Sequence, residues 1–504
     1  MAITGGTNLN SVPTSQKQTL SSNYLDLAGT TNEGWAQQYL PDLMEKEAEV
    51  FGQRTISGFL SQVGAEEAMT ADQVVWSEQA RLHISLKGTI VVDAGTESAG
   101  TFQVLSDIDG NNAGDTPAFT LADHGVRAND LCLVASPGVT TLCLATDVDT
   151  AVIMLEPYDA ADLSAHTSLT AGTATLLVVG SEYAKGKSYS SGAASANPLT
   201  AADSHEANEP TFKSFNNKPI IMKDYYEVSG SDASRIGWVE ITSEEGTSGY
   251  LWYLKAEADT RARFTDYLEM AMLEAVRGSN STVVDASIGL SGTDNSVGTQ
   301  GLFDAITDRG NVTSGVTGVN AATDLAEFDA ILAEFDNQGA IEENMMFVNR
   351  ATSLAIDDML ASMNSYGAGG TSYGVFDNDE DMALNLGFSG FRRGSYDFYK
   401  SDFRYLNDKA TRGGINAAAG SAAIRGVIVP AGTSSVYDQM LGKNMKRPFL
   451  HVRYRASQTD NRRLKTWVTG SVGAATSALD AMQMHFLSER CLITQGANNF
   501  MLMK

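Results

Sequence analysis

The strongest constraint in this 504-residue sequence is one long amphipathic stretch between residues 248 and 277. Apolar or small side chains recur there every three or four positions, as one face of an α-helix requires. Thr247 or Ser248 suits the N-cap, and Gly278 suits the C-terminal end. At 1.5 Å per residue the helix would be roughly 45 Å long, about the width of a domain. The predicted apolar stripe consists of Leu251, Leu254, Ala258, Ala262, Thr265, Leu268, Met272 and Val276.

The stretch from about residue 84 to 182 has a different pattern. Short runs of β-type residues follow one another closely, and turn residues such as Pro137-Gly138 separate them. This spacing is typical of a compact all-β module. Because the module lies inside the chain, we expect an inserted all-β domain. The expected strands are 84–92, 101–105, 131–135, 141–145, 151–155 and 173–179.

Two segments are predicted to be extended. Residues 1–34 are rich in Gly, Ser, Thr and Asn and have little to bury, which indicates a flexible arm. Residues 183–225 are polar, and three prolines at 198, 210 and 219 disfavour helix before them. We interpret this second segment as an arm or a projecting loop. A helix is expected at 41–63 and a short strand at 73–78.

The last third of the sequence alternates helical and strand patterns, which predicts an α+β fold class. Helices are expected at 324–335 and 351–363. We also expect residues 450–469 to form a β-hairpin. The expected strands are 345–348, 424–429, 450–455, 464–469, 482–487 and 491–494.

Composition excludes several classes of protein. Hydrophobic residues make up 43% of the chain, which favours a globular protein, and the net charge of −26 disfavours a protein that grips nucleic acid through phosphates. Three sparse cysteines indicate neither a disulfide framework nor a zinc site. No run of about 18 apolar residues and no signal sequence is present, so we expect no membrane association and folding in a reducing cytoplasm.

Motifs for catalysis or cofactor binding are incomplete. Residues 176–188 approach a phosphate-binding loop, but Ser181 occupies the required glycine position. Residues 107–118 begin like a calcium loop and end on Ala118, and residues 387–391 lack the last glycine of a nucleophile elbow. The six histidines are scattered without metal-ligand spacing. We therefore expect no enzyme activity, no metal and no cofactor.

A basic cluster stands out against the acidic composition, with eight Lys and Arg residues between positions 443 and 465. Arg453 and Arg455 alternate with Val452 and Tyr454, which places the two arginines on one face of a strand. We interpret the cluster as a contact with acidic patches of neighbouring subunits. Transient contact with nucleic acid and a merely solvated strand face are the alternatives. The predicted inter-subunit contacts are Arg453, Arg455, Arg462, Arg463, Lys465, Lys213 and Lys218.

The order of these parts resembles the Hong Kong 97-type fold of tailed-bacteriophage major capsid proteins. Individual segments are also similar to capsid proteins of crAss-like and marine phages. These segments are 40–60 with 75–79, 217–220 with 226–231, 258–264, and 493–500. Residues 84–182 lie outside the resemblance, and no Lys, Asn and acidic trio matches the cross-link that some family members form.

The resemblance implies an α+β capsid fold with an inserted all-β domain. Residues 1–83 would form an N-terminal arm and helix, 84–182 the insertion, and 183–235 an E-loop that lies over a neighbour. Residues 236–319 would hold the spine helix and part of the peripheral (P) domain. Residues 320–440 would supply mainly the axial (A) domain, and 441–504 would return to the P-domain.

The implied function is self-assembly into hexamers and pentamers of an icosahedral virion that encloses double-stranded DNA. Implied partners are further copies of the chain, decoration proteins, a portal, a scaffolding protein and DNA in weak non-specific contact, with assembly in the host bacterial cytoplasm. The alternatives are an encapsulin-like compartment shell, an undetected β-rich enzyme, and a phage fibre or adhesin.

Overall fold

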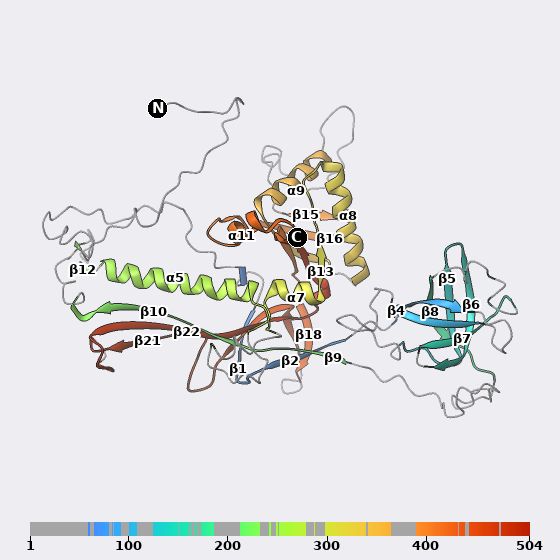
Figure 1. Ribbon diagram of the computed structural model, residues 1–504, viewed down its shortest axis with the longest axis horizontal. Helices are drawn as coiled ribbons and strands as arrows, with labels where there is room; N and C mark the ends of the chain where they lie inside the picture. Colours follow the sequence, from blue (N-terminus) through green and yellow to red (C-terminus); the bar gives the residue numbers. More distant parts are fainter. Residues whose placement is uncertain are drawn as a thin grey trace, which may run out of the picture. The chain divides into compact units, whose positions relative to one another are not determined.

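The computed structural model (Figure 1) describes part of the chain, which divides into two compact units. One unit holds Met222–Tyr267 and Leu464–Ser488; the other holds Ser57–Ile221, Leu268–Arg463 and Glu489–Lys504. The helix α5 (Leu251–Glu274) and the strand β22 (Ala481–Thr494) each continue from one unit into the other. The described residues are 59–60, 65–79, 83, 85–91, 100–107, 124–149, 151–160, 163, 166, 169, 173–185, 212–231, 241–242, 248–249, 251–278, 287, 298–338, 341–363, 390–431, 433–438, 443–472 and 475–504.

The first unit is a helix packed on long strands. Figure 1 shows α5 alongside β10 (Ile220–Ser229), β21 (Lys465–Gly470) and β22. The Phe264 ring lies 6.1 Å from the Phe486 ring between centroids, and Arg263 forms an ion pair with Asp224 at 3.1 Å. A two-residue pairing of β11 (Ile241–Thr242) with β12 (Ser248–Gly249) completes the described part of this unit.

The apolar face of α5 differs from the predicted stripe. The helix is confirmed, although it is three residues shorter at each end than expected. Leu268 and Met272 are buried as predicted, but Ala258 is exposed and Val276 is 62% exposed. The stripe is rotated because Phe264, whose large ring stacks near Phe486, takes the inward position. The buried residues on consecutive turns are Thr260, Phe264, Leu268 and Met272.

The second unit contains a closed six-stranded barrel whose strands follow the order β3-β4-β7-β6-β5-β8. All six strands predicted between residues 84 and 182 are confirmed; that they form an insertion stays a prediction. A single hydrophobic core fills the barrel, with Phe102, Cys132, Cys143, Ile153 and Leu176 fully buried. The strands are β3 (Ser85–Val91), β4 (Thr101–Asp107), β5 (Asp130–Ser136), β6 (Val139–Asp149), β7 (Val152–Pro157) and β8 (Thr173–Ser181).

Gly88 explains how the barrel closes around its largest side chain. A Cβ at this position would lie 2.6 Å from the Phe102 ring and 2.3 Å from the Gln103 carbonyl oxygen. The register of β3 against β4 shifts between Lys87 and Gly88, which marks a β-bulge. Glycine at a bulge lets another group approach the backbone closely, and here that group is a core phenyl ring.

The second unit also contains a six-stranded mixed sheet in the order β13-β23-β17-β14-β16-β15. Two helices, α8 (Ala321–Gln338) and α9 (Arg350–Met363), pack on it through a core that includes Phe328, Phe335, Met359 and Phe398 (Figure 1). Both helices, the strand at 345–348 and the strand at 424–429 are confirmed, and the mixture agrees with the predicted α+β class. The strands are β13 (Asn311–Thr313), β14 (Glu343–Val348), β15 (Gly390–Arg393), β16 (Tyr396–Asp402), β17 (Gly426–Pro430) and β23 (Met501–Met503).

The predicted hairpin of residues 450–469 is wrong. The strand β20 (Leu450–Arg455) pairs with residues 490–494 of β22, whereas β21 pairs with residues 482–487 of the same strand. Both are antiparallel to β22, so residues 456–464 form an excursion between two strands that run in one direction. The outer side of β20 carries β1 (Ala65–Met69) in parallel. The expected strands 482–487 and 491–494 are one continuous strand.

Smaller elements complete the described chain. The strand predicted at 73–78 is confirmed as β2 (Val74–Gln79), which pairs with β9 (Phe212–Asn217). The predicted arm at 1–34, most of the helix at 41–63 and residues 186–211 lie outside the described residues. Elements that the sequence did not predict include α7 (Leu302–Arg309), α10 (Arg404–Asn407), α11 (Arg412–Ala419), β18 (Thr433–Asp438) and β19 (Lys443–Pro448), as well as β1, β9, β10, β13, β15, β16 and β23.

Candidate functional site

The structure gathers four of the seven predicted contact residues into one arginine–carboxylate cluster on β1, β20, β22 and the β20–β21 excursion. Each of Arg453, Arg455, Arg462 and Arg463 has an acidic partner in the same chain. Their contact with a neighbouring subunit stays a prediction. We define the arginine cluster as Glu66, Glu67, Asp72, Arg453, Arg455, Arg462, Arg463, Glu489 and Arg490.

Glu489 is the buried centre of the arginine cluster, with only 4% of its surface exposed. Its Oε1 accepts from Arg455 Nε at 2.7 Å, and its Oε2 lies 2.6 Å from Arg462 Nη1. The excursion brings Arg462 to this point, because the Arg462 amide donates to the Arg455 carbonyl and the Glu489 amide donates to the Arg462 carbonyl. The Glu489 carboxylate therefore binds Arg455, directly before the excursion, and Arg462, near the end of the excursion.

The second half of the arginine cluster ties β1 to the C-terminal strands. Arg453 Nη2 lies 2.7 Å from Glu67 Oε2, its direct neighbour across the β1–β20 pairing. Glu66 pairs with Arg463 and lies 3.8 Å from Arg490. Residues near position 66 are thereby fixed to residues about 390 positions later in the sequence.

Burial sets the electrostatics of the arginine cluster. Desolvation lowers the pKa of Arg490, and the Glu66 charge opposes that shift. The hydrogen bond to Asp72 raises the pKa of Arg455, with burial acting against it. Asp72 itself has a 93% exposed side chain, so its ion pair with Arg455 is a surface pair of small energetic value. Loss of the buried Glu489 carboxylate would therefore cost more folding stability than loss of the Asp72 carboxylate.

The three predicted lysines are not members of the arginine cluster as defined above. Lys465 begins β21 opposite Leu487, and Lys213 lies on β9 opposite Glu78. Lys218 follows β9, and its amide donates to the Asn217 side chain at 2.9 Å. The prediction that these lysines contact a neighbour is untested.

Two buried polar side chains near β9 escaped the sequence analysis. Asn217, 1% exposed, donates to the Leu492 carbonyl at 2.6 Å and accepts from the Gln300 amide at 2.9 Å. Arg309 stacks over the Phe215 ring at 4.3 Å and lies 3.4 Å from Glu78, and burial lowers its pKa. Both join segments far apart in sequence, and no local pattern singled them out.

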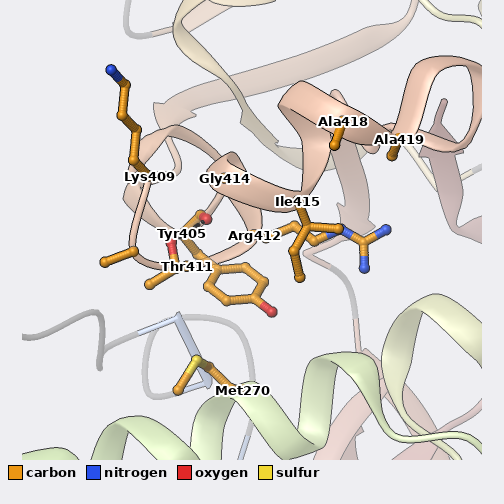
Figure 2. Close-up of a pocket in the computed structure, with 10 residues that line it drawn as sticks. Met270, Tyr405, Lys409, Thr411, Arg412, Gly414, Ile415, Ala418 and Ala419 are labelled. Carbon is orange, nitrogen blue, oxygen red and sulfur yellow. Dashed lines mark hydrogen bonds between the residues drawn. The ribbon is translucent and has the colours of Figure 1, made fainter.

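Figure 2 shows a shallow groove between Met270 of α5 and the segment of α10 and α11. The Tyr405 hydroxyl donates to Glu274 Oε1 at 2.9 Å, and Arg412 donates to Glu274 Oε2 at 2.7 Å. Burial, then the Glu274 charge, raises the pKa of Tyr405 above its usual range. The polar groups of Tyr405 and Arg412 are thus paired with Glu274, and Ile415 and three alanines supply apolar lining.

The near phosphate-binding loop and two of the histidines considered in the sequence analysis can be located in the structure. Gly180 of the near phosphate-binding loop is a strand residue of β8 opposite Leu131, and residues 186–188 lie outside the described part. His166 contacts Asp159 at 3.1 Å, and His485 stacks on Trp467.

Among the described residues, no group of three or more His, Cys, Asp or Glu side chains is arranged to hold a metal. No described helix combines the length and apolarity needed to span a bilayer.

No protein-family model matches the sequence, and no curated protein matches it. Among solved structures, one from Microbacterium phage Oxtober96 matches 94% of this chain and 97% of its own at 9% identity and a TM-score of 0.36. The capsid of the cyanophage P-SCSP1u matches over 97% and 98% at 7% identity and a TM-score of 0.36. The mature capsid of bacteriophage PhiM1 matches over 61% and 77% at 9% identity and a TM-score of 0.30. The chain is thus similar to bacteriophage capsid structures, at a distance in both sequence and three-dimensional arrangement.

Proposed function

We propose that this chain is a bacteriophage major capsid protein, which self-assembles into the hexamers and pentamers of an icosahedral head around double-stranded DNA. It acts as a structural protein of the virion and not as an enzyme. Assembly takes place in the host bacterial cytoplasm. Several sequence segments resemble capsid proteins of crAss-like and marine phages. This resemblance supports a phage head as the particle that the chain forms.

The observation that carries the proposal is how few apolar side chains are buried among the described residues of the first unit. Its long strands and the described part of α5 bury few apolar side chains completely, whereas Tyr225, Tyr267 and Leu479 are each more than 40% exposed. A core made of these described residues alone would be marginal. Contact with other copies would supply the missing burial, at about 25 cal/mol for each Å² of apolar surface. The completely buried apolar residues described in this unit are Val228, Phe264, Ala481, Phe486 and Leu487.

The arginine cluster supports a second part of the proposal. It fixes β1 to β20 and β22 within the second unit, and the segment before residue 65 precedes β1 in the sequence. In the proposed shell this segment is the N-terminal arm, residues 183–235 form the E-loop, and α5 is the spine helix. Each arm would lie on a neighbouring copy, where obligate interfaces bury several thousand Å².

The test is the assembly state of the full-length chain. Expressed alone and with candidate scaffolding protein, it should sediment as large particles, and negative-stain microscopy should show closed shells of uniform size. The proposed partners, which include decoration proteins, a portal and DNA in weak contact, can then be added to those shells. A chain that remains monomeric at every concentration, with or without scaffolding protein, would refute the proposal.

A further inference from the structure

Two of the three cysteines in the chain face each other across adjacent strands of the barrel. Cys132 of β5 is the direct partner of Cys143 of β6 in their antiparallel pairing. Both side chains are completely buried in the core that fills the barrel, and the other members of that core are apolar. Both thiols are free. The barrel therefore encloses a pair of reduced sulfur groups that the capsid proposal does not use.

The strand pairing sets the separation of the two cysteines. A turn of residues 137–138 joins β5 to β6, and 131–136 pair with 139–144 without a shift in register. Directly opposed residues of an antiparallel pair have Cα atoms about 4.5 or 5.5 Å apart, and a disulfide spans about 4.4–6.8 Å between Cα atoms. Opposed Cβ atoms lie about 4.5–5.5 Å apart, whereas a disulfide needs about 3.5–4.5 Å, so a small closure of the two strands is enough.

Cys491 provides an internal contrast to the barrel pair. It lies on β22 opposite Arg453, in a different hydrophobic cluster with Met69 and Trp76. Cys491 is as deeply buried as the barrel cysteines, but its described cluster contains no second cysteine. It can therefore be oxidised, but it cannot form a disulfide within its own core.

Only a small oxidant suits a pair with no exposed surface. Hydrogen peroxide resembles water in size, whereas a bulky disulfide reagent could not enter the folded core. Peroxide converts one thiol into a sulfenic acid and releases one water molecule, and the second thiol then displaces the sulfenic hydroxyl as another water. The two thiols together lose two electrons and two protons, which reduce one peroxide to two waters. Burial raises the pKa of both thiols to about 12, so the reactive thiolate is scarce and the reaction is slow.

We propose that Cys132 and Cys143 are a latent disulfide site, which a peroxide closes once the protein leaves a reducing compartment. The reducing agents of a cytoplasm keep thiols free, whereas oxidising surroundings let disulfides persist. The bond joins β5 to β6 behind their turn and so ties together two adjacent strands of the barrel. A cross-link of this kind stabilises a fold mainly by restricting the unfolded chain. Closure of the site does not depend on whether the chain forms shells.

Thiol counting on the full-length protein tests the site. The protein is treated with hydrogen peroxide, freed of oxidant, and unfolded in urea with iodoacetamide but no reductant. Trypsin then releases 128–185 with both barrel cysteines and 491–504 with Cys491, because no Lys or Arg precedes the last residue of either stretch. Mass spectrometry should show the first peptide without labels and two hydrogens lighter than its dithiol form. After reduction with a phosphine before alkylation, the same peptide should carry two labels.

Cys143→Ala is the matched control, because it leaves Cys132 without a partner thiol. Its 128–185 peptide should keep one label or gain oxygen, and it should not lose two hydrogens. In the unmodified protein, a peroxide-treated peptide that still accepts two labels, or whose two thiols both become sulfinic acids, would overturn the site. Neither measurement depends on particle formation, so this site and the capsid proposal can fail separately.

Unfolding measures the consequence of the bond. In pulse proteolysis, the oxidised barrel should resist unfolding to a urea concentration about 1 M higher than the reduced barrel, given a closed loop of about 12 residues. Reduction with a phosphine should remove the difference. Peroxide-treated Cys143→Ala should show no rise, which excludes an effect of oxidised methionines. An oxidised barrel that is no harder to unfold would overturn the stabilising role of the bond.

Discussion

Cys132 and Cys143 are direct cross-strand partners inside the barrel, and neither side chain reaches solvent. Burial is the main cause that raises the pKa of each thiol from 9.0 to about 12. The folded barrel therefore keeps both protons at a pH where the unfolded chain has lost them. The stability linked to these thiols is fully present below pH 9 and is lost as the pH rises toward 12.

We predict that the barrel loses up to about 1.4 kcal/mol per thiol for each pH unit above 9. Pulse proteolysis in urea, with barrel fragments followed by mass spectrometry, measures this free energy of unfolding. The double variant Cys132→Ala, Cys143→Ala should be less stable at pH 8, because it leaves cavities, but its decline above pH 9 should be shallower. Equal slopes for both proteins would contradict the pKa assignment.

Glu489→Gln should destabilise the second unit by about 3–5 kcal/mol, because it leaves Arg455 and Arg462 without a buried counter-charge. The measurement is urea unfolding of the full-length chain at neutral pH. Asp72→Asn provides a control on the same arginine. Its pair with Arg455 is exposed, so we expect a loss of about 1 kcal/mol or less. Similar losses for the two variants would show that burial of Glu489 is not what matters.

Gly88→Ala should destabilise the barrel by about 1–3 kcal/mol, since the new methyl group would overlap the Phe102 ring. Gly180→Ala is the matched control. A Cβ at Gly180 meets nothing nearer than Leu131 at 4.0 Å, and the backbone there does not have a positive φ. Thermal unfolding compares the two variants. If Gly180→Ala proved as harmful as Gly88→Ala, close packing against Phe102 would not be the reason for the glycine.

Removal of residues 186–210 should leave a folded subunit that forms no shells, because the proposed E-loop can no longer reach a neighbour. The deletion spares β8, which ends at Ser181, and β9, which begins at Phe212. Circular dichroism checks the fold, and negative-stain microscopy counts particles. A linker of Gly and Ser of the same length serves as the control for chain connectivity. Normal particles from the deletion would argue against the E-loop assignment.

The sequence predicted elements whose signal is local. The six barrel strands, α8, α9 and the bounds of β20 follow from apolar alternation or helical spacing within a few residues. Each of these patterns is complete within its own element. The barrel in particular could be predicted as an all-β module, because its turn residues, such as Gly138, adopt the positive φ that a tight turn requires.

What escaped prediction depends on partners distant in sequence. The inward face of α5 was misjudged because Phe486, more than 200 residues later, selects Phe264. The hairpin at 450–469 was wrong because β22 is long enough to pair with β20 and β21 in turn. The basic cluster was correctly located, but its carboxylates come from residues 66–72 and 489, which no local pattern connects with Arg453 or Arg455.

The first and last strands of the barrel, β3 and β8, are antiparallel neighbours, with Ser85 opposite Leu177. The chain therefore enters and leaves this module at the same end. A gene could acquire, lose or exchange such a cassette without moving the points where it joins the remaining polypeptide. For engineering, the same two junctions offer a place to graft a foreign protein whose own termini are close together.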